Sequence, residues 1–286
     1  MKSNVAILTD TTSGITIQAA KELGVYLILM PILIDGKLYL EDKDITKEFF
    51  YEKLNAGADV TTSQPSPGDI LDMFDTLLKD YEEVVYIPMS SGLSGTCQTA
   101  TMLAADYDGK VHVVDNQRIS ITMRQSVLDA IAMAEEGKNG AEIKEYLETD
   151  ALNAPIYLMV DTLKYLKKGG RVTPAAAAIG EVLNIKPVLK IDGGKLDAFA
   201  KVRGAKQALK TMLKALENDK ENRLKGKECI INGAYSGDES VGAELERVLK
   251  EAFPEFAIDI YALPMSISTH VGPGTMGIGV YSSYKA

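Results

Sequence analysis

Short apolar runs rich in valine and isoleucine alternate with longer segments through the first half of the chain. The short runs predict buried strands, and the longer segments carry apolar residues at helical spacing. This alternation indicates βαβ units and a mostly parallel sheet with flanking helices. The predicted strands cover residues 5–8, 26–29, 84–87, 111–114 and 156–160, and the predicted helices cover residues 15–23, 68–79, 96–105, 119–136 and 140–152.

The pattern changes near residue 160. Residues 186–191 and 195–200 flank the glycine turn Asp192-Gly193-Gly194, which predicts a β-hairpin and therefore an antiparallel sheet. Helices at 205–217 and 239–252 and strands at 228–232, 257–263 and 278–282 complete an α+β half. We therefore predict an α/β fold with two domains, 1–160 and 161–286, and a ligand pocket between them. The segment 45–78 could pack on either domain.

Composition narrows the possible partners. The chain has 286 residues and a formal charge of −9, which argues against a nucleic-acid surface and against docking on anionic membrane. Its two cysteines, Cys97 and Cys229, lack metal-ligand spacing, so we expect no metal site and a reduced, cytoplasmic protein. The apolar runs are too short for stable membrane insertion.

A hydroxyl-rich loop, Ser90-Ser91-Gly92-Leu93-Ser94-Gly95-Thr96, follows the predicted strand 84–87. Glycine amides, hydroxyls and the start of a helix are together suited to an anion. The loop contains no Lys or Arg, which favours a small group, a carboxylate or a single phosphate, over a polyphosphate. Within it, Ser94 is the main candidate and Gly95 and Thr96 are secondary ones.

Two further loops carry similar chemistry. Thr9-Asp10-Thr11-Thr12-Ser13 follows the strand 5–8, and Thr61-Thr62-Ser63-Gln64-Pro65-Ser66 precedes the helix 68–79. We expect the three loops to converge, with Thr62 as a main contact and Asp10 and Ser63 as secondary ones. Any one of these loops alone is better explained as a helix cap or a Ser/Thr turn, but the occurrence of three favours a shared site.

His270 is predicted in a glycine-containing loop, where its imidazole could donate to an anion and order a neighbouring hydroxyl. It could equally satisfy turn carbonyls. Basic residues gather around Lys167-Lys168-Gly169-Gly170, which is typical of a helix carboxyl terminus. Arg171 lies beyond that end, and we expect it to face outward toward an acidic partner or a phosphate.

Familiar nucleotide motifs are absent from the sequence. Residues 272–277 match G-x-G-x-x-G, but a strand follows where a dinucleotide site needs a helix. No glycine-lysine pair precedes Ser or Thr, so there is no P-loop.

In sequence order, several of these motifs together resemble the DegV family, and the resemblance spans nearly the whole chain. Many relatives have an aromatic residue after Ser-Gly-Thr, where this chain has Cys97. The motifs are Thr9-Asp10-Thr11-Thr12-Ser13, Thr62-Ser63-Gln64-Pro65-Ser66, residues 90–96, Leu166-Lys167-Lys168-Gly169-Gly170-Arg171, Ile185-Lys186-Pro187 and His270-Val271-Gly272-Pro273-Gly274.

The resemblance implies a carrier that holds one long-chain fatty acid, such as palmitate, between its domains. The carboxylate would be bound by Thr62 and Ser94, with His270 supporting that end. It further implies a separate ATP-dependent fatty acid kinase subunit that converts the carboxylate to an acyl phosphate, docking near Arg171 and Arg203. The chain itself would need no cofactor and would not be catalytic alone.

Two other functions stay open on the residues. One is a hydrolase with Ser94 as nucleophile, His270 as base and Asp10 as the orienting acid. The other is a phosphoryl-transfer protein related in architecture to dihydroxyacetone kinases, which would require nucleotide binding by this chain alone.

Overall fold

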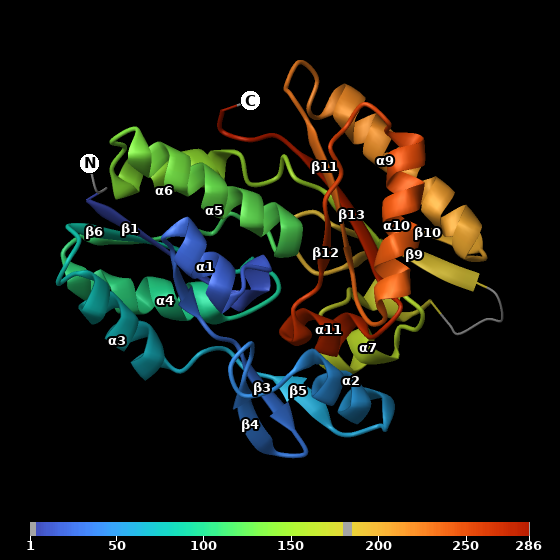
Figure 1. The fold of residues 1–286 in the computed structure, drawn as a ribbon, viewed down its shortest axis with the longest axis horizontal. Coiled ribbons are helices and arrows are strands. Elements are labelled where there is room, and N and C mark those ends of the chain that lie inside the picture. The colour runs from blue at the N-terminus through green and yellow to red at the C-terminus, as the bar shows by residue number, and fades with distance from the viewer. Residues whose placement is uncertain (1–3, 180–184, 286) are drawn as a thin grey trace.

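The computed structural model describes residues 4–179 and 185–285. Two sheets lie side by side, and a smaller third sheet sits below them (Figure 1). This arrangement confirms the predicted α/β fold, with a parallel sheet and a separate α+β region.

The first sheet is parallel throughout, with the strand order β2-β1-β6-β7. Alternate residues of β1 and β6 pack on opposite faces of the sheet, so helices cover both sides. Helices α1, α5 and α6 lie on one face, and α3 and α4 on the other. The strands are β1 (Val5–Asp10), β2 (Tyr26–Ile28), β6 (Glu83–Ile87) and β7 (Val111–Val113); the helices are α1 (Ile17–Leu23), α3 (Pro67–Leu77), α4 (Thr96–Ala104), α5 (Ser120–Glu135) and α6 (Gly140–Thr149), with short 3-10 turns η1 (Thr11–Ser13) and η2 (Ala105–Tyr107).

The second sheet has six strands in the order β10-β9-β8-β13-β11-β12 and is antiparallel except for the β11–β12 pair. Helices α9 and α10 cover one face, and the other face is turned toward the first half of the chain. The predicted hairpin is confirmed as β9 and β10. The elements are β8 (Ile156–Met159), β9 (Ile185–Ile191), β10 (Asp197–Arg203), β11 (Ile230–Tyr235), β12 (Ile260–Ala262), β13 (Met276–Tyr281), α9 (Ala205–Asn222) and α10 (Glu239–Ala252).

One strand lies in a different sheet from the one we predicted. The run at 156–160 was expected in the parallel sheet, but β8 pairs antiparallel with β9 and β13. A fully buried strand reads as an uninterrupted apolar run in either kind of sheet, so the sequence does not reveal its partners. The strands of the second sheet therefore begin with β8 at Ile156, and the domain boundary near residue 160 stays a prediction.

The third sheet, with the order β4-β3-β5, was not predicted. It divides the segment 45–78: α2 and β5 contact the short helix α11, whereas α3 packs on the first sheet. Helix α7 lies against α11, and α8 follows it. These elements are β3 (Pro31–Ile34), β4 (Lys37–Leu40), β5 (Val60–Thr62), α2 (Lys47–Asn55), α7 (Lys164–Gly169), α8 (Pro174–Ala177) and α11 (Met265–Val271).

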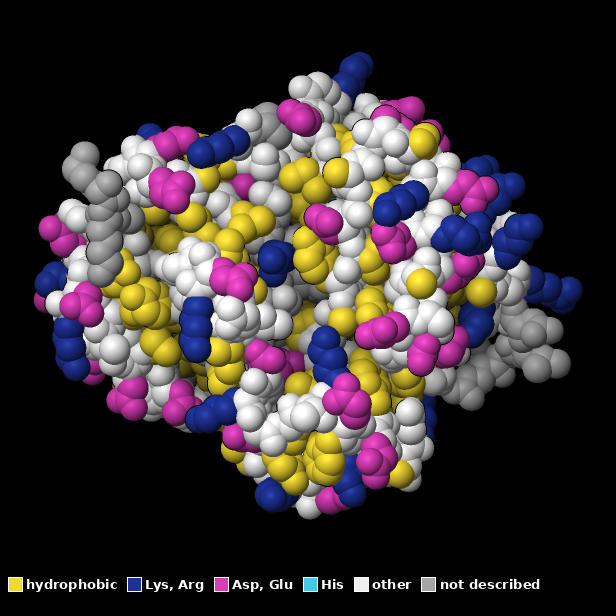
Figure 2. All heavy atoms as spheres, viewed as in Figure 1, with side chains coloured by type: hydrophobic (Ala, Val, Ile, Leu, Met, Phe, Trp, Pro, Cys, Tyr) yellow, Lys and Arg dark blue, Asp and Glu magenta, His cyan; other side chains and the backbone are white. Residues whose placement is uncertain are grey.

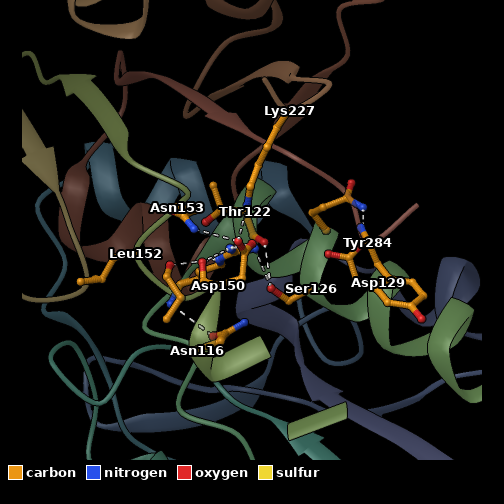
Figure 3. A network of polar contacts seen from close by, with 12 residues as sticks. Asn116, Thr122, Ser126, Asp129, Asp150, Leu152, Asn153, Lys227 and Tyr284 are labelled. Atoms are coloured by element: carbon orange, nitrogen blue, oxygen red, sulfur yellow. Dashed lines mark hydrogen bonds and ion pairs between the residues drawn. The ribbon is translucent and has the colours of Figure 1, made fainter. Parts of the chain in front are cut away.

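A buried polar network joins the two halves (Figure 3). The Arg118 guanidinium donates to the Asp150 carboxylate at 2.7 Å and to the Asp150 carbonyl at 2.6 Å. Lys227, from the loop between α9 and β11, reaches the same carboxylate at 3.0 Å. Nearby, the chain after β13 returns to α5, where the Tyr284 backbone N–H donates to Asp129 at 2.9 Å. These contacts fix the second half of the chain against the end of α6 and the side of α5.

Candidate functional site

A cavity, partly open to solvent, lies between the first and second sheets; with the space at its mouth included, its empty volume is about 900 Å³. Its apolar wall comes mainly from β8, β9 and β11 of the second sheet and from α5 and α11, and Gly277 of β13 also lines it. The apolar side chains include Leu93, Ile119, Ile121, Ile156, Leu158, Ile191, Leu263 and Ile267, and the polar ones include Thr12, Thr62, Ser63, Ser94, Arg171 and His270.

Residues from all three hydroxyl-rich loops line this cavity, which confirms that the loops converge. Thr12 comes from the turn after β1, Thr62 ends β5, and Ser94 precedes α4. The β5 loop and the Ser94 loop touch at Gly95, where a Cβ atom would lie 3.0 Å from the Gln64 side-chain oxygen. Capping accounts for only part of the chemistry, because Ser66 caps α3 while Thr62 and Ser63 line the cavity.

Thr62 and His270 form a pair at the cavity. His270 Nε2 lies 2.7 Å from Thr62 Oγ1. His270 belongs to the last turn of α11 rather than to the loop we predicted, because the helix continues to Val271 and ends at Gly272. Since α11 packs on β5, the helix brings the ring to the end of the strand that carries Thr62.

The His270 imidazole is held in its neutral form. Burial, together with the nearby charges of Arg171 and Lys168, lowers its pKa from 6.5 to about 4. The second ring nitrogen, Nδ1, is buried and makes no hydrogen bond to any residue that the structure describes. It faces Gly169 at the end of α7, where a Cβ atom would overlap the ring.

The Ser94 loop is held on both sides by the second half of the chain. Ser94 Oγ lies 2.9 Å from Thr96 Oγ1 and accepts from the Thr96 N–H at 3.2 Å. Ser90 donates its hydroxyl to the Gly193 carbonyl in the β9–β10 turn. At Gly92 a Cβ atom would lie only 2.7 Å from Gly194 Cα, so this close approach of two backbones requires glycine.

Arg171 lines the cavity, which corrects our expectation that it faces outward. Gly170 ends α7 in the left-handed conformation, φ 68°, and turns the chain back toward the Ser94 loop. There Arg171 Nε donates to the Leu93 carbonyl at 3.3 Å, and its Nη1 donates to the Gly169 carbonyl. Within residues 4–179 and 185–285 no carboxylate pairs with it, so its charge is balanced only by carbonyl dipoles. Arg203, by contrast, is exposed at the end of β10.

Asp10 does not line the cavity. It is fully buried, and its carboxylate accepts from the Thr12 N–H at 2.9 Å, from the Thr12 hydroxyl and from the Met89 N–H at 3.4 Å. Burial raises its pKa to about 6. Asp10 therefore shapes the turn that presents Thr12, and Thr12 takes the place at the cavity that we assigned to Asp10. Among the other secondary candidates, Ser63 lines the cavity and Thr96 is the buried partner of Ser94.

Glu41 is a buried carboxylate that sequence reasoning missed. It accepts from the Thr11 hydroxyl at 2.6 Å and from the Ser266 N–H and hydroxyl at 3.0 and 2.7 Å. It thus ties the turn after β1 to the start of α11. Its neighbours in sequence, Asp42, Lys43 and Asp44, are those of an exposed turn, so no local signal marks Glu41 as buried.

The hydrogen bonds do not form a hydrolase triad. Ser94 is paired with Thr96, His270 with Thr62, and Asp10 with Thr12 and Met89. In the described ranges, no cluster of His, Cys, Asp and Glu could hold a metal ion. No helix there is long and apolar enough to cross a membrane.

Solved structures of two other proteins are similar to this one over nearly its whole length. The structure of a Thermus thermophilus DegV family protein, described as binding fatty acid, has a TM-score of 0.87 and 34% identity, covering 97% of this chain and 99% of that one. The structure of Bacillus subtilis DegV, described as a fatty acid binding protein, has a TM-score of 0.85 and 27% identity, covering 98% and 99%.

Sequence comparison extends over nearly the full length. A DegV domain-containing protein of Caldanaerobacter subterraneus subsp. tengcongensis is 31% identical over 275 residues, 96% of this chain and 97% of that protein. The family described as "Uncharacterised protein, DegV family" matches residues 4–283. The chain therefore belongs to the DegV family.

Proposed function

We propose that this protein binds one long-chain fatty acid in the cavity, with its carboxylate between Thr62 and Ser94 and its tail along the apolar wall. The observation that carries the proposal is an apolar cavity into which three hydroxyl loops converge beside Arg171, a cation that pairs with no carboxylate in the described part of the chain. The fatty-acid-binding relatives of the same fold support it.

The energetics favour such a ligand. Each buried methylene contributes about 0.8 kcal/mol, so a palmitoyl tail has on the order of 10 kcal/mol of gross apolar driving force. Hydrogen bonds to a charged carboxylate add about 1.5–3 kcal/mol each. The tail thus supplies most of the affinity, and the hydroxyls orient the head group.

His270 would fix the direction of the Thr62 hydroxyl. An orphaned buried N–H costs more than an unused acceptor, so the hydrogen of the neutral ring belongs on Nε2, leaving the unpartnered Nδ1 bare. His270 then donates to Thr62 Oγ1, and the Thr62 hydrogen is free to donate to the ligand. Arg171 supplies the positive charge that the Ser94 loop itself lacks.

We further propose that the protein is a cytoplasmic carrier that presents the carboxylate to a separate ATP-dependent kinase subunit. Arg203 is exposed and available for such a partner, while Arg171 lies at the cavity. In this proposal the chain binds and orients the acid, and the partner supplies ATP and the phosphoryl transfer.

The decisive experiment is mass spectrometry of small molecules released by denaturing the purified protein. We expect about one equivalent of fatty acid per chain. Protein that carries no fatty acid and fails to bind added palmitate would overturn the proposal. Ester hydrolysis lost in Ser94→Ala would favour a hydrolase, and ATP consumption by this chain alone would favour a kinase.

A further inference from the structure

Strand β13 lies in the interior of the second sheet, yet two of its residues facing the cavity side are glycines. Met276, Ile278 and Val280 pack with α9 and α10 on the opposite face. The cavity side is therefore left to Gly277, Gly279 and Tyr281. Glycine inside a strand is unfavourable and often marks the close approach of a backbone or a ligand.

The protein itself accounts for Gly279. A Cβ atom there would lie 3.2 Å from Ile121 Cδ1 and 3.4 Å from Thr122 Cγ2. Both belong to the first turn of α5, so this helix packs directly on the strand backbone. The space above Gly279 is filled by the chain.

The protein does not account for Gly277. The nearest atoms to a Cβ atom there are the Ala234 carbonyl oxygen at 3.7 Å and Leu158 Cβ at 3.8 Å, which are ordinary contacts. Its φ is not positive, so any residue could adopt this backbone. Gly277 lines the cavity, and so do its register partners Ala234 on β11 and Leu158 on β8.

We propose that Gly277, with Ala234 beside it, determines which acyl chains the protein accepts. Gly277 has no side chain and Ala234 has only a methyl group, which leaves a hollow in the sheet surface, and the fatty acid tail crosses the sheet there. The hollow stops at Gly279, where α5 fills the next position along the strand. Chain length is therefore set by the size of the residues at 277 and 234. This inference rests on the proposed fatty-acid function.

The test is a series of saturated acids from octanoate to stearate, with affinities measured for wild type, Gly277→Val and Ala234→Val. In wild type, each added methylene should raise affinity by up to about fourfold until the hollow is filled. In both variants the rise should stop at least two carbons earlier, and palmitate should bind at least tenfold more weakly. Ala198→Val, on exposed edge strand β10, makes the same change as Ala234→Val outside the cavity and should leave the series unchanged.

Two results separate the possible failures. If wild type and the folded Val variants give parallel series, this inference is wrong while the proposed function stands. If wild type binds no acid of the series, the proposed function fails and the inference with it. Thermal unfolding of each variant checks its fold, and Ala234→Val provides the decision if Gly277→Val does not fold.

Discussion

At the scale of single residues, the sequence identified most of the polar side chains of the cavity but not their partners. Thr62, Ser94 and His270 were predicted from hydroxyl-rich loops and a rare histidine, and all three line one cavity. Arg171 was predicted to face outward, because the turn that redirects it depends on the left-handed conformation of Gly170. Glu41 gave no signal at all. Local composition reveals chemistry, but it does not reveal which distant segment faces it.

Thr62→Ala and Ser94→Ala should each weaken palmitate binding by roughly tenfold or more, since each removes a donor to a charged group. The fold should persist, because both side chains lie at the cavity and not in a core. Isothermal titration calorimetry measures the loss. Thr61→Ala and Ser91→Ala are matched controls: both residues are exposed neighbours in the same loops. Equal affinity in test and control variants would contradict the head-group assignment.

The depressed pKa of His270 predicts a pH dependence of stability. In the unfolded chain its pKa is about 6.5, and in the folded protein about 4, so between these values the unfolded state binds more protons. The contribution is fully present above pH 6.5 and is lost as the pH falls toward 4, by on the order of 3 kcal/mol. As the pH falls from 6.5 to 4, the free energy of unfolding of wild type should therefore decrease relative to that of His270→Gln. Urea unfolding of both proteins across this pH range measures the difference. A difference independent of pH would contradict the neutral, buried imidazole.

At the scale of elements, the predicted helices and strands are largely those of the structure, because hydrophobic periodicity records burial. The pairing of the strands was predicted less well than the elements themselves. Strand β8 was placed in the wrong sheet, and the third sheet was missed. Its strands β3 and β4 pair across the two-residue turn Asp35-Gly36, a local hairpin signal that our prediction did not use, whereas β5 joins from further along the chain.

The contact between α7 and α11 leads to a prediction about Gly169. Replacing it with alanine would drive a methyl group into the His270 ring, which should destabilise the protein by about 1–3 kcal/mol and displace the ring from Thr62. Fatty acid affinity should fall with stability. Gly68→Ala in α3 is the matched control, since its Cβ atom would lie 3.7 Å from the nearest atom, Ser66 Oγ. Chemical denaturation and calorimetry measure both effects; equal behaviour of the two variants would refute the close packing.

At the scale of the whole molecule, the sequence predicted a pocket between the two halves, but not which apolar residues line it. Its apolar wall consists of residues such as Ile156 and Leu158 that read as ordinary core in a linear pattern. Only the packing of the second sheet against α5 leaves them facing the cavity.

Charge is distributed without a dominant patch on the face shown in Figure 2, where acidic and basic side chains are interspersed.

The polar network between the halves predicts a contrast between two variants. Arg118→Met should destabilise the protein by about 3–5 kcal/mol, because Arg118 is 2% exposed and its loss removes the buried cation from the Asp150 carboxylate, which keeps the partly exposed Lys227 and Asn153. Lys227→Met should cost less than about 1 kcal/mol, because Lys227 is partly exposed and Arg118 remains. Lys250→Met, which breaks a surface pair with Glu246 on α10, is the control and should be nearly neutral. Urea midpoints rank the three variants. A larger loss in Lys227→Met than in Arg118→Met would show that the contact between the halves contributes more to stability than the Arg118–Asp150 pair within the first half.

The backbone contact between Gly92 and Gly194 has a kinetic consequence. The loop that carries Ser94 is held down by the β9–β10 turn on one side and by Arg171 on the other. With a fatty acid bound as we propose, we expect its release to require the opening of this contact, so its dwell time should reflect the opening rate of the protein and not diffusion. The rate at which bound fatty acid exchanges would then not depend on the concentration of competing acid. The protein would keep its fatty acid until it binds a partner.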